Sequence, residues 1–368
     1  MKTVRRLLHG EILRAVGFVL VGFLALFLFF DVVDELQNLA QLASQGYKLH
    51  HALLFVAFKT PSHIYELMPI SVLIGCIFVM ARLAQSSEFT ILRTGGLAPL
   101  KALSTLLQLG LVFVFMTFLI GDYVAPWADR QGVLVKAPFQ GNLTVGRTGA
   151  WLKERQDKRH FAVNVRSFDG IRRMQNVRIH EFNEDGQLLA IISAPQADFG
   201  EGQWLLQQAE ETSLKNNAAD NTTRYQLREH AQLAWPTGIS ADMVTAAVLS
   251  PERMRTWELF NYMRHLSNNN QNAQRYEIEF WRKVFYPLSC LVMLVMALPF
   301  AYVHFRSGQI SGHVFGGVLV GISFALLNNL FGHAGNLQNW QPWLTAAAPS
   351  LIYSAISLMG FWWMVLRR

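Results

Sequence analysis

Long apolar runs and polar segments alternate along the chain and divide it into three parts. Six apolar runs approach or exceed the length of about 20 residues that an α-helix needs to cross a bilayer. They cover residues 15–33, 61–81, 102–121, 284–303, 314–331 and 344–366. Three of them precede residue 122 and three follow residue 283. The pattern therefore predicts two groups of three membrane-spanning helices, separated by a long insertion.

In the insertion, hydrophobic residues are spaced differently from those in the six apolar runs. Short stretches of alternating or β-branched residues occur at 160–165, 176–182, 187–192, 203–207 and 224–227, with turn residues between them. Such spacing is typical of an all-β sandwich or jelly-roll. After residue 250 the pattern becomes helical again. We therefore predict transmembrane helices in 1–121, a β-jelly-roll-like domain in 122–250, a helical connector in 251–283 and transmembrane helices in 284–368.

The basic residues indicate how these helices are oriented. Short segments on the cytoplasmic side of a membrane are enriched in Lys and Arg. If the N-terminus is cytoplasmic, the short outer loops contain only Lys48 and Lys59. The inner side then holds Lys2, Arg5, Arg6, Arg14, Arg82, Arg93, Lys101, Arg306, Arg367 and Arg368. We therefore expect a multi-pass protein with both termini in the cytoplasm and the insertion on the opposite side.

The composition argues against several other classes of protein. Of the 368 residues, 52% are hydrophobic and 15% are charged, which is more apolar than an ordinary soluble protein. The formal net charge is +7, but the basic residues are scattered and do not alternate with aromatic residues as in a nucleic-acid-binding surface. Cys76 and Cys290 both lie in apolar runs, so no disulfide framework is expected.

The sequence contains none of the common motifs for catalysis or nucleotide binding. A Gly-x-x-x-x-Gly-Lys-Ser/Thr phosphate loop, a His-Glu-x-x-His motif, a Cys-x-x-Cys pair and a Gly-x-Ser-x-Gly elbow are all missing. We therefore predict no catalytic residue, metal site, cofactor or ATP site in this chain. Asp31, His63, Glu66 and Asp122 fall within a turn or two of predicted span ends. This position is typical of groups that face headgroups or water, and it argues against a proton relay.

A polar segment between the second and third spans predicts a short helix at the cytoplasmic surface. Ser86 or Ser87 provides an N-cap, and Glu88 follows in the first turn, where the helix dipole favours a negative charge. Gly95-Gly96 is a strong signal for the end of a helix. The predicted helix therefore covers about residues 87–94.

The same helix carries an acid on its apolar side. Phe89, Ile91 and Leu92 form an apolar arc at helical spacing, and Glu88 falls within that arc. A helix that only lies on a bilayer keeps its carboxylate toward water, whereas this arc suits a protein groove with a basic or hydrogen-bonding partner. Glu88 also fits the simpler role of a first-turn cap, so the local pattern leaves both interpretations open.

Several motifs, taken in their order, resemble the LptF/LptG permeases of lipopolysaccharide export. They are residues 11–36 with Asp34, Ser87-Glu88-Phe89 followed by two glycines, Gly-Asp-Tyr-Val-Ala-Pro at 121–126, and Arg-Tyr-Glu-Ile-Glu-Phe-Trp-Arg-Lys at 275–283 before Pro-Leu-Ser. The element at 121–126 favours the LptG branch of the family. The resemblance covers the whole chain, including the arrangement of three helices, a β insertion and three helices.

The resemblance implies an inner-membrane permease subunit of an ABC-type exporter with a periplasmic β domain. Such a subunit extracts lipopolysaccharide and passes it to a periplasmic bridge. The implied partners are an LptF-like sister permease, an LptB-like ATPase dimer and an LptC-like periplasmic protein. In this family the helix between the second and third spans is the coupling helix, so Glu88, Phe89, Leu92 and Arg93 are the expected coupling residues. The alternative is a non-transporting scaffold or sensor whose β domain only binds periplasmic partners.

A lipid with acyl chains and phosphates calls for an apolar cavity with cations at its outer rim. Arg130 and Lys136 lie just beyond the third span, where similar proteins carry basic lipid contacts, although each also fits an ordinary cation at the membrane edge. The outer end of the first span departs from the family, because Asp31, Asp34 and Glu35 stand where relatives can carry lysines. The phosphate contact then falls to other residues, or the preferred lipid A is a modified one.

Two consecutive Gly-x-x-x-Gly motifs lie in the fifth span, Gly312 with Gly316 and Gly317 with Gly321. Small residues at this spacing let helices approach closely in a membrane. The approach is expected either at the interface with a partner subunit or within the chain.

Overall fold

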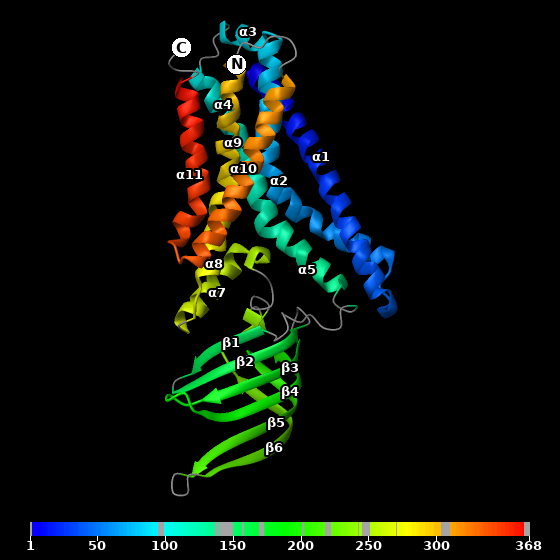
Figure 1. The fold of residues 1–368 in the computed structure, drawn as a ribbon, viewed down its shortest axis with the longest axis vertical. Helices are drawn as coiled ribbons and strands as arrows, with labels where there is room; N and C mark the ends of the chain where they lie inside the picture. Colours follow the sequence, from blue (N-terminus) through cyan, green and yellow to red (C-terminus); the bar gives the residue numbers. More distant parts are fainter. Residues whose placement is uncertain are drawn as a thin grey trace. The chain divides into compact units, whose positions relative to one another are not determined.

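The computed structural model describes residues 2–94, 99–136, 139, 150–156, 158–168, 173–200, 202–217, 222–241, 243–244, 251–269, 271–302 and 310–363. Its elements are drawn in chain order in Figure 1. The helices are α1 (Lys2–Leu42), α2 (Leu49–Gln85), α3 (Glu88–Thr94), α4 (Pro99–Leu119), α5 (Ala125–Lys136), α7 (Thr256–Asn268), α8 (Gln274–Phe285), α9 (Ser289–Ala297), α10 (Ile310–Leu337) and α11 (Pro342–Phe361). The strands are β1 (Ala150–Gln156), β2 (Arg159–Phe168), β3 (Arg173–Phe182), β4 (Leu188–Gly200), β5 (Gln203–Asn217) and β6 (Thr222–Pro236).

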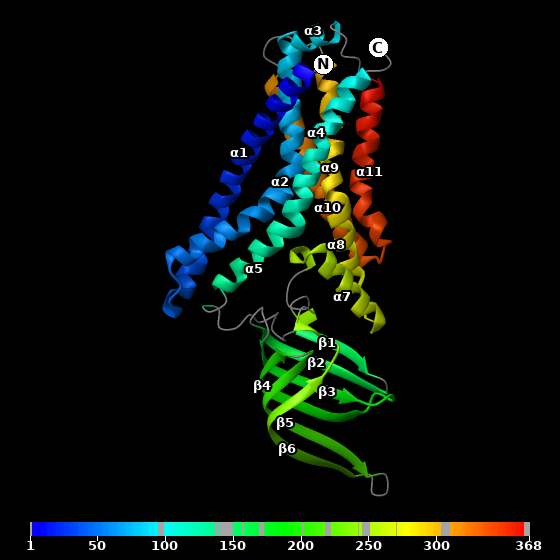
Figure 2. The same cartoon turned by 180° about the vertical axis from the view of Figure 1, so that it is seen from behind.

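Among the described residues, six helical segments are long and apolar enough to cross a membrane, which confirms the predicted number. They cover Val4–Gln45, Leu49–Gln85, Leu100–Lys136, Gln274–Tyr302, Ser311–Leu337 and Pro342–Phe361. The third consists of α4 and α5 joined by a π-helical turn at Ile120–Val124, and the fourth joins α8 and α9 through a short turn. The helices extend beyond the apolar runs. α2, for example, contains both Pro61 and Pro69 and changes direction along its length (Figures 1 and 2).

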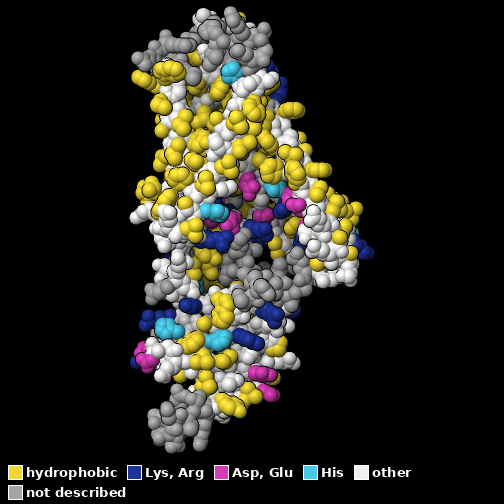
Figure 3. Space-filling view, viewed as in Figure 1, with side chains coloured by type: hydrophobic (Ala, Val, Ile, Leu, Met, Phe, Trp, Pro, Cys, Tyr) yellow, Lys and Arg dark blue, Asp and Glu magenta, His cyan; other side chains and the backbone are white. Residues whose placement is uncertain are grey.

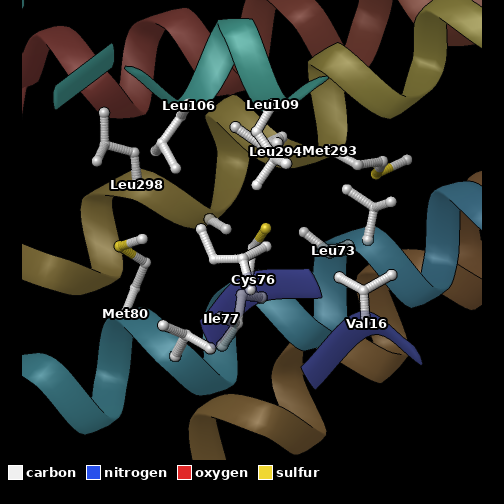
Figure 4. Close-up of a cluster of buried hydrophobic side chains, with 14 of the residues drawn as sticks. Val16, Leu73, Cys76, Ile77, Met80, Leu106, Leu109, Met293, Leu294 and Leu298 are labelled. Carbon is white, nitrogen blue, oxygen red and sulfur yellow. The ribbon is translucent and has the colours of Figure 1, made fainter. Parts of the chain in front are cut away.

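The membrane helices share an apolar core. Figure 4 shows Val16 of α1, Leu73 and Cys76 of α2, Leu106 of α4 and Met293 of α9 pointing toward one another. Each of these side chains is no more than 2% exposed. Close packing of this kind holds helices together through many small dispersion contacts. Cys76, like Cys290, is a free thiol, as the sequence predicts.

The outward faces of the same helices are also apolar. Phe18 is 82% exposed on α1, Phe115 is 65% exposed on α4 and Leu330 is 63% exposed on α10. Hydrophobic side chains cover much of the helical part in the space-filling view (Figure 3). An apolar surface this extensive indicates contact with lipid, because water-exposed proteins rarely show such patches.

The strands form one antiparallel sheet in the order β1-β2-β3-β4-β5-β6. Alternate residues of the strands bury one face, including Val163, Ile179 and Leu206. Trp204 is fully buried in this core, and its indole N–H donates to the Ile239 carbonyl at 2.7 Å. The inserted all-β domain is therefore confirmed. The described strands make a single open sheet with neighbours in chain order, so the jelly-roll form of the expectation is not confirmed.

A line of interrupted pairing crosses this sheet. Arg166 on β2 and Asn176 on β3 lie opposite each other but are not paired in the ladder. The same holds for Pro195 on β4 and Gln208 on β5. Asn176 and Gln208 have positive φ values of 49° and 50°, and proline has no N–H to donate. The ladder is therefore broken at one level across five strands, from β2 to β6. A polar hollow on the sheet, lined by residues that include Arg166, Arg178 and Glu210, lies along this line.

The chain divides into two compact units. One contains Met1–Gln37, Val56–Asp129 and Gln274–Arg368, with the apolar core of the membrane helices. The other contains Asn38–Phe55 and Arg130–Ala273, with the sheet, α7 and the ends of helices α1, α2 and α5. Each unit has its own hydrophobic core.

Candidate functional site

The short helix between the second and third spans forms close to where the sequence predicts it. α3 runs over Glu88–Thr94, and the Ile91 N–H donates to the Ser87 carbonyl at 3.1 Å. Ser87 has a φ of 60°, a left-handed conformation that reverses the chain between α2 and α3. The predicted glycine stop at 95–96 lies outside the described residues, and the next helix begins at Pro99.

Phe89 attaches α3 to the membrane helices of its own chain. Its side chain is 2% exposed and belongs to the core that α1, α2, α4 and α9 share. Its ring also meets the ring of Tyr302 edge to face, with centroids 5.1 Å apart. Tyr302 ends the fourth candidate span. Phe89 therefore packs α3 against the end of that span.

The outward side of α3 carries an acid and an apolar group. Glu88 is exposed, and Ile91 is 67% exposed. The side chains of Leu92 and Arg93 lie outside the described part of the structure. Of the four expected coupling residues, the structure therefore shows Glu88 facing outward and Phe89 facing inward.

Polar contacts link the first three spans at the end that bears α3. Arg82 of α2 forms an ion pair with Glu11 of α1. Arg5 Nη1 donates to Gln108 Oε1 of α4 at 3.0 Å. His9 Nε2 lies 3.0 Å from the carbonyl oxygen of Thr105. These bonds join α1, α2 and α4 beside the surface helix.

A second polar cluster joins α1 and α2 at their other end. Lys59 Nζ lies 2.6 Å from Asp31 Oδ1, and His63 Nε2 lies 2.5 Å from Asp31 Oδ2. The Asp31 and His63 side chains are only 11% and 14% exposed. Asp31 and His63 are thus enclosed and bonded to each other, which differs from the expectation that both face headgroups or water. In the space-filling view, charged side chains and histidines gather at one end of the helices (Figure 3).

The π-helical turn of the third span is bonded by a buried lysine. Lys283 of α8 is 7% exposed and its Nζ donates to the Gly121 carbonyl at 3.0 Å. π turns leave carbonyls displaced from the usual helical partners, so a cation is a suitable donor. Beside it, Arg282 forms an ion pair with Glu279 at 2.6 Å and donates to Asn329 at 3.2 Å. This network connects the third, fourth and fifth spans.

The two expected lipid-binding cations are engaged with the protein. Arg130 of α5 forms an ion pair with Glu258 of α7, and its side chain is 31% exposed. Lys136 is 8% exposed and its Nζ lies 4.6 Å from the ring centroid of Phe55, in cation–π contact. A lipid phosphate would therefore compete with Glu258 for Arg130, and Lys136 is largely covered in this arrangement.

The four glycines of the fifth span fall into two pairs. A Cβ atom on Gly317 would lie 2.6 Å from Ile77, and one on Gly321 would lie 2.9 Å from Ile70. Both isoleucines belong to α2, so this pair permits packing within the chain. A Cβ atom on Gly312 or Gly316 would have no neighbour within 4 Å. Only this second pair is open to another subunit.

The whole chain matches known permeases. The model of the family described as lipopolysaccharide export system permease LptF/LptG matches residues 6–364. The chain belongs to the LptF/LptG family. It is 25% identical to the lipopolysaccharide export system permease protein LptG of Haemophilus influenzae over 372 residues, covering 100% of this chain and 99% of the relative. It is 27% identical to LptG of Escherichia coli K12 over 341 residues, covering 91% and 90%. Among LptF/LptG permeases the chain is therefore LptG-like.

Sequence reasoning missed two features of this LptF/LptG chain. The Lys283 bond to the Gly121 carbonyl was not expected, although both residues lie in motifs that carry the family resemblance. The pairing of Lys59 with Asp31 was also missed. A lysine and an aspartate at the same depth of two adjacent spans predict an ion pair, because an unpaired charge near a membrane is energetically costly.

Proposed function

We propose that this chain is the permease subunit of an ABC-type lipopolysaccharide exporter in the bacterial inner membrane. A separate LptB-like ATPase dimer supplies the energy, an LptF-like permease forms the other half of the pathway, and an LptC-like protein receives the lipid in the periplasm. The observation that carries the proposal is a full-length family match in a chain whose short helix between the second and third spans presents Glu88 outward.

In this mechanism one face of α3 binds the ATPase and the other packs against the membrane helices. Glu88 and the neighbouring Ile91 bind the ATPase, and Glu88 accepts hydrogen bonds from a basic or N–H group of the partner. Phe89 holds α3 to the core and bears on Tyr302. Closure of the ATPase dimer then moves α3, and Phe89 passes the movement to the fourth span. The pathway between this chain and its sister narrows and expels lipid toward the β domain.

Arg130 and Lys136 are proposed contacts for the lipid phosphates. Arg130 exchanges Glu258 for a phosphate when lipid arrives, since a guanidinium binds carboxylates and phosphates with the same bidentate geometry. Lys136 would have to leave the Phe55 ring to reach lipid. Gly312 and Gly316 form the proposed contact with the sister permease.

The test separates the two sides of α3. Glu88→Gln removes the charge from an exposed position, so the chain alone keeps its thermal stability. Loss of a charge-assisted hydrogen bond costs about 2 kcal/mol, or roughly 30-fold in ATPase affinity. Glu184→Gln, an exposed acid between β3 and β4, is the matched control and leaves ATPase binding unchanged. The readouts are ATPase affinity, lipid-stimulated ATP hydrolysis and transport in proteoliposomes.

Phe89→Ala is expected to change the stability of the isolated chain, which Glu88→Gln leaves unchanged. It opens a cavity in the core and lowers the stability of the isolated chain by about 3–5 kcal/mol. Unchanged ATPase affinity and transport in Glu88→Gln would contradict the coupling role of Glu88. Unchanged stability of the isolated chain in Phe89→Ala would contradict the role of Phe89 in holding α3 to the core. If neither ATPase nor lipid binds the wild-type chain together with its sister permease, the export function itself is wrong and the scaffold alternative gains support.

A further inference from the structure

α7 carries an exposed aromatic and basic face that the proposed transport mechanism does not use. Trp257 is 68% exposed and Phe260 is 42% exposed, and their rings stack with centroids 5.8 Å apart. Arg264 is exposed one turn further along. At 100° per residue these three side chains fall on one side of the helix. Large exposed aromatics in a soluble environment usually mark a binding surface.

The opposite face of α7 is held inside its own unit. Leu259, Tyr262 and Leu266 are buried. Burial lowers the pKa of the His265 imidazole below its usual value, and the neighbouring Glu154 and the Lys153 backbone of β1 offset only part of this shift. Asn269 Oδ1 accepts a hydrogen bond from the Arg155 N–H at 3.0 Å. These contacts determine which face of α7 points inward, so the Trp257 face points outward.

Two connections keep α7 close to the membrane boundary. Arg130, which pairs with Glu258 of α7, belongs to the helix that continues the third candidate span. In sequence, α7 ends at Asn268 and the fourth candidate span begins at Gln274, so the linker cannot exceed roughly 20 Å even when extended. The short linker therefore keeps the end of α7 near the start of the fourth candidate span, whether or not Arg130 is paired with Glu258.

We propose that the Trp257, Phe260 and Arg264 face of α7 binds the outer leaflet of the membrane as an interfacial anchor. Trp and Phe rings settle at the boundary between headgroups and acyl chains, and Arg pairs with lipid phosphates. The anchor holds the base of the sheet unit at the bilayer surface. This inference does not depend on what the permease transports.

The test uses spin labels on the full-length chain in nanodiscs of phosphatidylethanolamine and phosphatidylglycerol. A nitroxide is attached at Trp257→Cys or Phe260→Cys, and Tyr225→Cys on β6 is the matched control, because Tyr225 is an aromatic residue with 78% exposure. Cys76 and Cys290 are fully buried, and the labelled wild-type chain measures their background. Collision rates are measured with oxygen, which concentrates in lipid, and with a water-soluble nickel chelate.

Labels at positions 257 and 260 are expected to collide several times more often with oxygen than with the nickel chelate, and the label at 225 is expected to show the reverse. Arg264→Glu is expected to lower the ratio at 260 in nanodiscs with phosphatidylglycerol and to change it little in phosphatidylcholine alone. Water-like ratios at 257 and 260 would overturn the proposal. Exclusion of both reagents would also overturn it, because protein would then cover the face. An unchanged ratio in Arg264→Glu would remove the headgroup contact.

Discussion

Gly75 of α2 is the glycine whose lack of a side chain has the clearest structural reason. A Cβ atom at this position would lie 2.7 Å from the backbone nitrogen of Val16 in α1. Backbone atoms cannot rotate away as the end of a side chain can. Gly317 is different, because its nearest neighbour is the terminal methyl group of Ile77. The close packing of α1 against α2 at this point therefore depends on Gly75.

Gly75→Ala should destabilise the chain by about 1–3 kcal/mol, because overpacking forces α1 and α2 apart. Gly316→Ala is the matched control, since its new methyl group meets open space and alanine is favoured over glycine in a helix by up to about 1 kcal/mol. Thermal unfolding of the purified chain in detergent measures both. Equal stability of the two variants would mean that the helices do not cross at Gly75. A loss of sister-permease binding in Gly316→Ala alone would support its place at the subunit interface.

The third span is two helices joined by a π-helical turn, and the fourth span supplies the donor that satisfies this turn. Lys283 Nζ reaches the Gly121 carbonyl within the first turns of the fourth span. Gly121 itself lies against Tyr65 of α2, where any side chain would collide with the ring. Three spans therefore meet at the place where the helical hydrogen bonding of the third span changes.

Lys283→Met should lower the stability of the chain by about 1–3 kcal/mol, because it keeps the apolar stem and leaves the Gly121 carbonyl without this donor. Part of the loss is offset, since a buried ammonium group carries a desolvation cost that methionine does not. Lys101→Met, at an exposed position on α4, is the control and should leave stability unchanged. Chemical denaturation followed by tryptophan fluorescence gives the difference. A stable Lys283→Met variant would show that the bond contributes little to holding the turn.

The elements of this chain differ in how far sequence alone predicts them. The spans follow from hydropathy, because runs near 20 apolar residues have few alternatives to a membrane helix. α3 follows from its caps. Which side of α3 faces the chain does not follow, since Phe89 and Ile91 are both apolar and only tertiary packing buries one and exposes the other. The sequence also does not predict the break in the sheet's ladder, because Asn176 and Gln208 adopt positive φ values without being glycine.

The molecule consists of two units with separate apolar cores, one built from membrane helices and one from the sheet. Leu73 is fully buried in the first core and Trp204 in the second. The two units also differ in their surfaces, because the helices have extensive exposed apolar faces and the sheet carries a polar hollow. Units of this kind are expected to open separately, each with its own free energy.

Trp204→Ala should destabilise the sheet unit by about 3–5 kcal/mol, and Leu73→Ala should destabilise the helical unit by about 2–5 kcal/mol. Trp204 also loses its hydrogen bond to the Ile239 carbonyl, which adds to the first effect. Hydrogen exchange of the full chain in nanodiscs resolves the two regions. Trp204→Ala is expected to speed exchange in β1–β6 and leave α2, α4 and α9 protected, and Leu73→Ala is expected to do the opposite. Faster exchange in both regions for either variant would mean that the units unfold as one, because a single cooperative structure cannot lose one core and retain the other.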